Sequence, residues 1–445
     1  MSEFLNDNWM ESGKDLELFK ESIKKVQNAT EIRKVPASAL NFLSVFEKDC
    51  ETIAIPLHGD NSHIDDSPLS LEFYRYDVPT AAYMSKKYSA TAIEEAMKNG
   101  LFVAINGDES EPEVDREIIE KWMADGSFLP ISAKAMNSFS VRSGIGGPGF
   151  LSEHLVRDLA IAKRMNNDAM TVNLVLRKDL DNGNQKVFAA MSNKYVRIPQ
   201  AYIPILIKKI EEKFGKDLGK IECHYWSVEH SFTRCYIEFP EKGKEIMEAY
   251  EDEKRPMESL IPGLMFETSD IGDCSMRVRG YFRFEGSESY FFLAEEYSQI
   301  HTTAVNDEMI MESLESKIFP AYTYYPTMLA KLMTINLTDD SFDEESAVKK
   351  MGNIYKKISK TISLKKAIGK KREKKYITEF CEAVNPLLEY TAYDVVIDFM
   401  LLASMIAEEE KGITQTLKST IAKCIPDAVA FDFSEFAITP VPEAA

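Results

Sequence analysis

The chain has few cysteines, and no two of them stand close together in the sequence. Six occur in 445 residues, scattered without a CxxC spacing. Disulfide scaffolds of small secreted domains need closely spaced, even sets of cysteines, so that class is excluded. We therefore expect free thiols in a reducing compartment. The first residues, Met-Ser-Glu-Phe-Leu-Asn-Asp, also lack the basic-then-apolar order of a signal peptide, which favours a cytoplasmic location.

Long uninterrupted apolar runs are missing as well. The most apolar stretch, residues 383–407, is interrupted by Glu389, Asp394 and Asp398. A membrane-spanning helix needs about 20 consecutive, predominantly apolar residues, and charged side chains within it are rare. We interpret this stretch as a buried helix and expect no membrane partner.

Positive charge is scarce overall. The chain has 53 basic and 72 acidic residues, which gives a formal net charge of −19. This balance argues against a molecule that binds a polyanion over its whole surface, so any nucleic-acid contact must be a local basic patch. Hydrophobic residues make up 44% of the chain, enough to bury a core and to argue against bulk disorder.

Motifs for enzyme chemistry are also lacking. The glycine-rich residues 144–149 do not end in GK[ST], and no clear strand precedes them, so a turn between helices explains them better. Residues 268–270, Thr-Ser-Asp, resemble a nucleophile motif, but no histidine is tied to them by local spacing, so turn chemistry explains them adequately. We therefore predict no catalytic residues, although an enzyme whose site is assembled from distant residues remains an alternative.

Metal-ligand spacings are equally weak. Cys223, His224, His230 and Cys235 match no familiar zinc finger, and strand alternation puts the first two on opposite faces. The His/Asp group at 58–66 is better explained as a polar turn. The sequence therefore predicts no metal site and no cofactor.

The pattern of elements predicts an α+β fold with a central antiparallel sheet. At this length we expect two or three domains. Residues 1–125 form a mixed α/β region, residues 126–305 an α+β core, and residues 306–445 a helical domain. The core includes a hairpin whose turn lies at 181–184, where Asp-Asn-Gly-Asn joins two alternating strands.

The most informative stretch that is present is residues 276–284, Met-Arg-Val-Arg-Gly-Tyr-Phe-Arg-Phe. With the period of two of a β-strand, the apolar side chains fall on one face and can close a core. The other face presents Arg277, Arg279, Tyr281 and Arg283, a row that suits phosphates and stacked bases. The alternative is an open sheet face whose arginines pair with nearby Asp and Glu.

A second strand, predicted at residues 232–239, alternates in the same way. Arg234, Tyr236 and Glu238 lie on one face of it. If this strand pairs with residues 276–284, the polar face gains an arginine, a tyrosine and a partly neutralising glutamate.

A lysine-rich segment concentrates the remaining positive charge. Residues 356–375 hold ten basic residues and one acid, so the segment carries +9 and the rest of the chain −28. Ile354, Ile358 and Ile362 supply a helical stripe before Gly369, and the basic residues after this glycine begin another helix. Concentrated positive charge in an acidic chain is typical of a local polyanion site. The alternatives are a solvated helix face or a clamp onto the acidic runs at 339–345 and 408–410. The candidate residues here are Lys365, Lys366, Lys370, Lys371, Arg372, Lys374 and Lys375.

Short motifs resemble the DUF932 family of phage and plasmid proteins over roughly residues 128–300. They are Pro130–Phe139 with the glycine-rich break after it, Asn173-Leu-Val-Leu-Arg177, and Ala189–Ile198, and residues 388–394 have a looser counterpart. The resemblance implies a mobile-element origin and the cytoplasm of a bacterial host. The family has no established catalytic activity, so no catalytic residue is carried over.

The same resemblance singles out Arg177, Ser192, Tyr195 and Arg197 as candidates for a shared surface. Their structural alternative is that Ser192 lies in a turn and that Tyr195 belongs to the core.

The leading hypothesis is a non-enzymatic protein that binds single-stranded nucleic acid, supporting replication or recombination. Arginines would neutralise phosphates, Tyr281 would stack a base, and the lysine-rich segment would extend the basic track. Homo-oligomerisation would multiply weak contacts. The second hypothesis is a virion-assembly or host-interaction protein whose acidic surface, or aromatic tail from Phe431, meets a protein partner.

Overall fold

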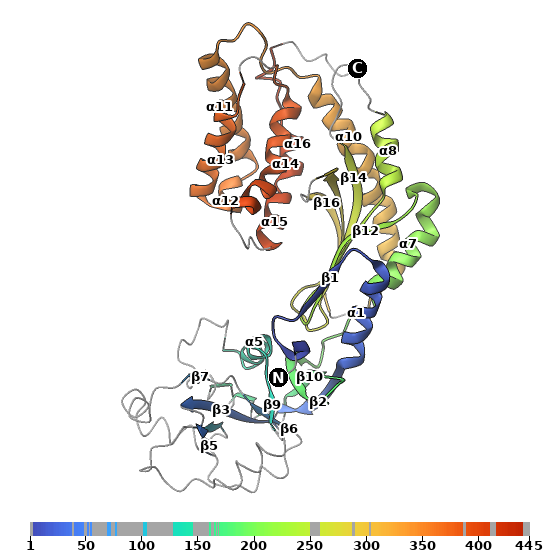
Figure 1. Ribbon diagram of the computed structural model, residues 1–445, viewed down its shortest axis with the longest axis vertical. Coiled ribbons are helices and arrows are strands. Elements are labelled where there is room, and N and C mark those ends of the chain that lie inside the picture. Colours follow the sequence, from blue (N-terminus) through green and yellow to red (C-terminus); the bar gives the residue numbers. More distant parts are fainter. Residues whose placement is uncertain are drawn as a thin grey trace.

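The computed structural model describes most of the chain (Figure 1). The described residues are 3–37, 40–48, short strands between 51 and 104, and 128–438 except 146–159, 162–163, 166, 168, 250–258, 287–289, 302–303, 386–388 and 410–414. The His/Asp group at 58–66 and most of the glycine-rich stretch lie outside them.

A six-stranded antiparallel sheet lies at the centre of the molecule, in the order β1-β12-β13-β14-β15-β16. Its strands are β1 (Met10–Gly13), β12 (Glu222–Glu229), β13 (Thr233–Glu238), β14 (Leu260–Thr268), β15 (Met276–Phe284) and β16 (Tyr290–Gln299). The predicted α+β class is confirmed, and so is the strand at 276–284.

The pairing of β13 with β15, considered above as a condition for a larger polar face, does not occur. Strand β14, which the sequence analysis did not identify, lies between them and pairs with both. Its sequence contains Pro262 and Gly263, two residues that weaken strand propensity. Both residues fit their surroundings in the structure. Gly263 leaves the space that Tyr281 of β15 fills, and Pro262 packs beside Gly243 of α8 (Pro240–Ala249).

Helices cover one face of this sheet and build the main core. They are α1 (Leu16–Ala29), α7 (Tyr202–Leu218), α8 (Pro240–Ala249) and the continuous stretch α9 (Asp307–Ser313), η4 (Leu314–Ile318) and α10 (Phe319–Met333). Met276, Val278, Phe282 and Phe284 of β15 all belong to this core, as the alternation predicts.

At Gly280 the helical layer approaches the sheet closely. The π-helical turn η4 passes over β15 at this point, and a Cβ at residue 280 would lie 2.7 Å from Cγ2 of Ile318 and 2.6 Å from Cδ1 of Leu293. Atoms that close overlap, so only glycine fits without movement of the packed side chains.

The N-terminal segment contributes strands to two sheets. β1 is an edge of the six-stranded sheet, and β2 (Thr30–Pro36) is an edge of a three-stranded sheet with β10 (Thr171–Lys178) and β11 (Gln185–Ser192). The hairpin predicted around 181–184 joins β10 to β11 and is confirmed, and α5 (Ala133–Arg142) packs on β11.

A further sheet gathers around β3 (Leu40–Lys48). The other strands in it are β4 (Glu51–Thr52), β5 (Ala54–Ile55), β6 (Leu69–Glu72), β7 (Tyr76–Asp77), β8 (Leu101–Ala104) and β9 (Phe128–Pro130).

The C-terminal helices stand on the other side of the six-stranded sheet (Figure 1). They are α11 (Glu344–Thr361), α12 (Leu364–Ile368), α13 (Lys370–Glu382), α14 (Ala392–Glu409), α15 (Gln415–Ala422) and α16 (Ile425–Val429). Helices α15 and α16 contact β16. Most of the apolar run at 383–407 is α14, whose Val395, Phe399 and Leu402 are buried, so its interpretation as a buried helix is confirmed. Among the described helices, none has both the length and the apolar character that a bilayer crossing requires.

Candidate functional site

The polar face of β15 is occupied by ion pairs within the sheet. Arg234 of β13, Glu267 of β14 and Arg277 of β15 are direct neighbours across three strands. Nε of Arg234 lies 2.6 Å from a carboxylate oxygen of Glu267, and NH1 of Arg277 lies 3.4 Å from the other oxygen. One buried carboxylate therefore serves two guanidinium groups, and Arg277 keeps 37% of its side-chain surface exposed.

The other two arginines of the row are also paired. Arg279 contacts Glu296, its cross-strand neighbour on β16. Arg283 donates from Nε and NH2 to the two carboxylate oxygens of Glu238, at 2.6 and 2.8 Å. Such a bidentate pair fixes both side chains. The alternative interpretation, arginines paired with acids of the same sheet, describes this face.

Tyr281 is not available to stack a base. It is fully buried and lies across Gly263 of the neighbouring strand, where a Cβ would come within 2.5 Å of its ring. Its hydroxyl donates to the carbonyl of Ile237 at 3.2 Å, and Tyr236 beside it is also buried. The expectation of an open Arg/Tyr face is therefore wrong for Tyr281. Because Gly263 on β14 has no side chain, the tyrosine ring packs against the sheet.

Three residues that the resemblance singled out converge on the segment Ser269–Asp270, two of them on the Asp270 carboxylate. Arg177 of β10 donates to Oδ1 of Asp270 at 2.8 Å, and Arg197 donates to Oδ2 at 3.0 Å. Tyr195 donates to the carbonyl of Ser269, next to Asp270 in the chain, at 3.3 Å. The expected surface role of Arg177 is corrected, since both Arg177 and Asp270 are completely buried.

This cluster joins the two antiparallel sheets. Arg177 belongs to the three-stranded sheet, while Asp270 follows β14 of the six-stranded sheet. Burial by itself would raise the pKa of Asp270, but the charges and hydrogen bonds of Arg177 and Arg197 hold it below its usual value. Nearby His230 lies in an aromatic pocket, where burial and the charge of Arg177 lower its pKa to about 3. The arrangement is a buried structural junction.

Asp270 is a residue that the sequence analysis did not recognise as a partner. Its tripeptide, 268–270, was interpreted as turn chemistry alone. The signal that could have found it is the need of any buried arginine for an acidic partner.

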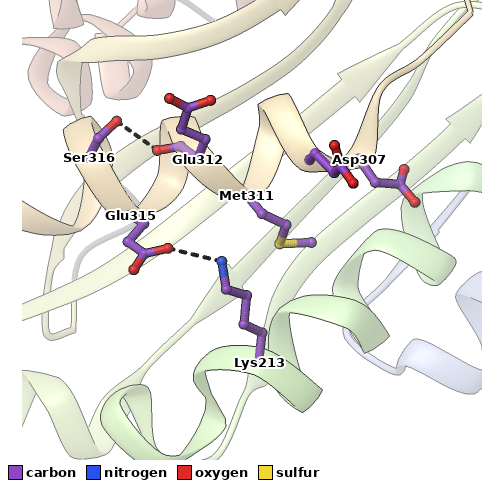
Figure 2. A pocket seen from close by; sticks show the side chains of 7 residues that line it. Lys213, Asp307, Met311, Glu312, Glu315 and Ser316 are labelled. Atoms are coloured by element: carbon purple, nitrogen blue, oxygen red, sulfur yellow. Dashed lines mark hydrogen bonds and ion pairs between the residues drawn. The ribbon is translucent and has the colours of Figure 1, made fainter.

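The groove between α7 and the α9–η4 stretch has a volume of about 530 Å³ (Figure 2). Lys213 points across it and lies 2.9 Å from Glu315, and the Ser316 hydroxyl donates to the carbonyl of Glu312. The described lining is lysine, methionine, serine and carboxylates, with no histidine beside a nucleophile. The described lining therefore contains no histidine-activated nucleophile.

The cysteine and histidine group of β12 and β13 does not form a metal site. Within the described part of the chain, no three His, Cys, Asp or Glu side chains are grouped as metal ligands. His224 lies 3.7 Å from Glu238, and Cys235 is buried in the core.

The lysine-rich segment lies on α11, α12 and α13. Ile354, Ile358 and Ile362, the predicted helical stripe, are buried, and α13 begins after Gly369, as predicted. We define the basic surface as the exposed lysines of this segment without an ionic partner among the described residues. Its members are Lys356, Lys360, Lys365, Lys366, Lys370, Lys371 and Lys374.

The three remaining basic residues of the segment are engaged. Lys357 contacts Glu435 of the tail, and Lys375 contacts Glu409 of α14. Arg372 is partly buried and donates to the carbonyl of Ile368 at 3.5 Å. A clamp onto the acidic run at 408–410 thus exists for one lysine and leaves most of the positive charge exposed.

The two long helices of this region differ in how their charges meet the helix dipole. Helix α11 has Asp343 as its N-cap, Glu344 and Glu345 in its first turn, and Lys360 in its last turn, all favourable positions. Helix α13 begins with Lys370 and Lys371, has one acid, Glu373, in its first turn, and its N-cap Gly369 supplies no side-chain hydrogen bond. Cations at the positive end of a helix are unfavourable, so fold stability does not account for them.

Comparison with known proteins adds no assignment. No family model, curated protein or solved structure matches this chain.

The aromatic tail packs on its own chain. Phe433 is buried in the main core, Phe431 stacks on Phe436, and Lys357 of α11 lies 5.2 Å from the centre of the Phe436 ring. In this arrangement residues 431–436 pack with the C-terminal helices, and Asp432, Ser434 and Glu435 remain exposed.

Proposed function

We propose that this protein binds nucleic acid through the basic surface on α11–α13. The observation that carries the proposal is the exposure of seven lysines without an ionic partner among the described residues, in a chain that is otherwise strongly acidic. Concentrated lysines that release counterions from phosphates are the usual source of such binding.

The electrostatics of α13 support this proposal. Lys370 and Lys371 are exposed in the first turn of the helix, where they oppose its dipole. A solvated helix face has no need of that arrangement, whereas a phosphate near these lysines would compensate both their charge and the helix terminus.

The sheet face of β15 has a smaller part in the proposal than the sequence suggested. Of its arginines only Arg277 is substantially exposed, and it shares Glu267 with Arg234. A role in replication or recombination, the phage or plasmid origin implied by the DUF932 resemblance, and a homo-oligomeric state stay predictions.

The test is fluorescence anisotropy of labelled DNA with the full chain across a salt series. Neutralising all seven lysines of the basic surface to Gln should abolish binding at low salt. The matched control neutralises seven exposed lysines elsewhere: Lys24, Lys34, Lys178, Lys194, Lys216, Lys244 and Lys331. It changes net charge equally and should retain most of the affinity. Equal losses in both variants, or no binding by the wild-type chain, would refute the proposal.

For the wild-type chain the logarithm of affinity should fall linearly with the logarithm of salt. Seven neutralised phosphates would give a slope approaching about −6 on duplex DNA. Circular dichroism of each variant checks that the helices are intact.

A further inference from the structure

The aromatic side chains of the basic segment all point inward. Between residues 344 and 382 the aromatic residues are Tyr355, Tyr376 and Phe380, and each is at most 4% exposed. Tyr355 and Phe380 pack against each other and against Phe399 of α14. The basic surface therefore presents no ring on which a base could stack.

This absence bears on the kind of nucleic acid that the surface suits. Proteins that hold single strands combine a positive groove with exposed aromatic rings, and stacking supplies about 1–3 kcal/mol per base. On the six-stranded sheet, the two tyrosines of the predicted Arg/Tyr face, Tyr281 and Tyr236, are buried and cannot replace them. On α11–α13 themselves, charge is therefore what is available to hold a ligand.

Groups suited to reading bases are scarce on these helices. The basic surface consists of lysines, whose ammonium groups act as point charges. Between residues 344 and 382, Asn353 is the one exposed amide, and Arg372, the one arginine, is partly buried. The bidentate contacts that distinguish base pairs come mainly from Arg, Asn and Gln. A lysine surface on rigid helices matches a regular array of phosphates rather than a base sequence.

A duplex offers the denser array. Duplex DNA carries about one negative charge per 1.7 Å of axis, and it releases more counterions per neutralised phosphate than a single strand. We propose that the basic surface binds the phosphate backbone of duplex DNA, without reading its sequence and in preference to single strands. This inference rests on the proposed function and replaces the single-strand preference expected from the sequence.

The experiment compares one labelled duplex, each of its two strands alone, and a second duplex of unrelated sequence, all with the full chain at the same salt. The duplexes should bind alike, within about twofold, and at least about tenfold more tightly than either strand. Neutralising Lys370 and Lys371 to Gln should weaken both duplexes equally.

The outcomes separate the two proposals. Single strands that bind as tightly as the duplex, with binding lost when the seven lysines are neutralised, would overturn the duplex inference and leave the proposed function standing. A difference of more than about fivefold between the two duplexes would also overturn it, because charge contacts alone do not discriminate sequence. Failure of every DNA to bind at low salt would refute the proposed function itself.

Discussion

Removing the two lysines at the start of α13 should strengthen the fold and weaken binding at the same time. Lys370→Gln with Lys371→Gln deletes two charges from the first turn of a helix that has no side-chain cap. Each unfavourable charge at a helix terminus costs about 0.3–1 kcal/mol at low ionic strength, so the double variant should gain about 0.6–2 kcal/mol locally. If both lysines contact phosphates, the magnitude of the salt slope should fall by about 2.

The assay has two readouts on the same protein. Hydrogen exchange of the α13 amides and urea denaturation report the stability of the helix, and anisotropy over a salt series reports the slope. The control is Lys360→Gln in the last turn of α11, where the lysine favours the dipole. This control should lose a few tenths of a kcal/mol to about 1 kcal/mol while also weakening binding.

Two results would refute the reasoning. An unchanged affinity and slope in the double variant would remove α13 from the interface. A loss of stability in that variant would mean that the lysines have a structural role in the packing of the C-terminal helices.

Three further predictions concern the fold. Asp270→Ala should destabilise the chain by about 3–5 kcal/mol in urea denaturation, because it leaves two guanidinium groups without their buried carboxylate. The control Asp273→Ala removes a carboxylate from an exposed ion pair and should cost about 1 kcal/mol or less. Similar losses in the two variants would contradict the structural role of the Asp270 junction. Burial raises the pKa of Asp398 from 3.8 to about 6, so its contribution to stability is fully present below pH 3.8 and is lost as the pH rises through about 6. Asp398→Asn should therefore stabilise the protein at pH 7 by up to about 3 kcal/mol, with a gain that disappears toward pH 4, and a pH-independent effect would count against this origin. Gly280→Ala should lower the melting temperature, because its Cβ would overlap Ile318 and overpacking costs about 1–3 kcal/mol. An unchanged melting temperature would show that η4 shifts to accommodate the added methyl group at little cost.

Much of the local structure followed from the sequence. The alternation at 276–284 predicted β15 with its bounds and its core face, and the apolar stripe of 354, 358 and 362 predicted the buried side of α11. Both are short-range patterns: a strand alternates every second residue and a helix repeats every 3.6, so one apolar face identifies the element and its orientation.

Local sequence patterns did not predict the order of the strands in the sheet. Strand β14 was not predicted because Pro262 and Gly263 lower its strand propensity. This strand carries Glu267, which lies between two arginines. Likewise, nothing in the chain near Arg177 indicates that Asp270, 93 residues away, is its partner. Ion-pair partners depend on which strands become neighbours, a decision made by the packing of the whole core.

By itself, therefore, the sequence determined where positive charge is concentrated and which faces of the elements are apolar. It determined that residues 276–284 form a one-sided strand and that the lysines of 356–375 lie opposite a buried stripe. Only the tertiary structure decided which cations remain exposed. The arginines of β15 meet carboxylates because β13, β14 and β16 bring acids beside them. Most lysines of α11–α13 are instead exposed to solvent and form no ion pair with a described residue.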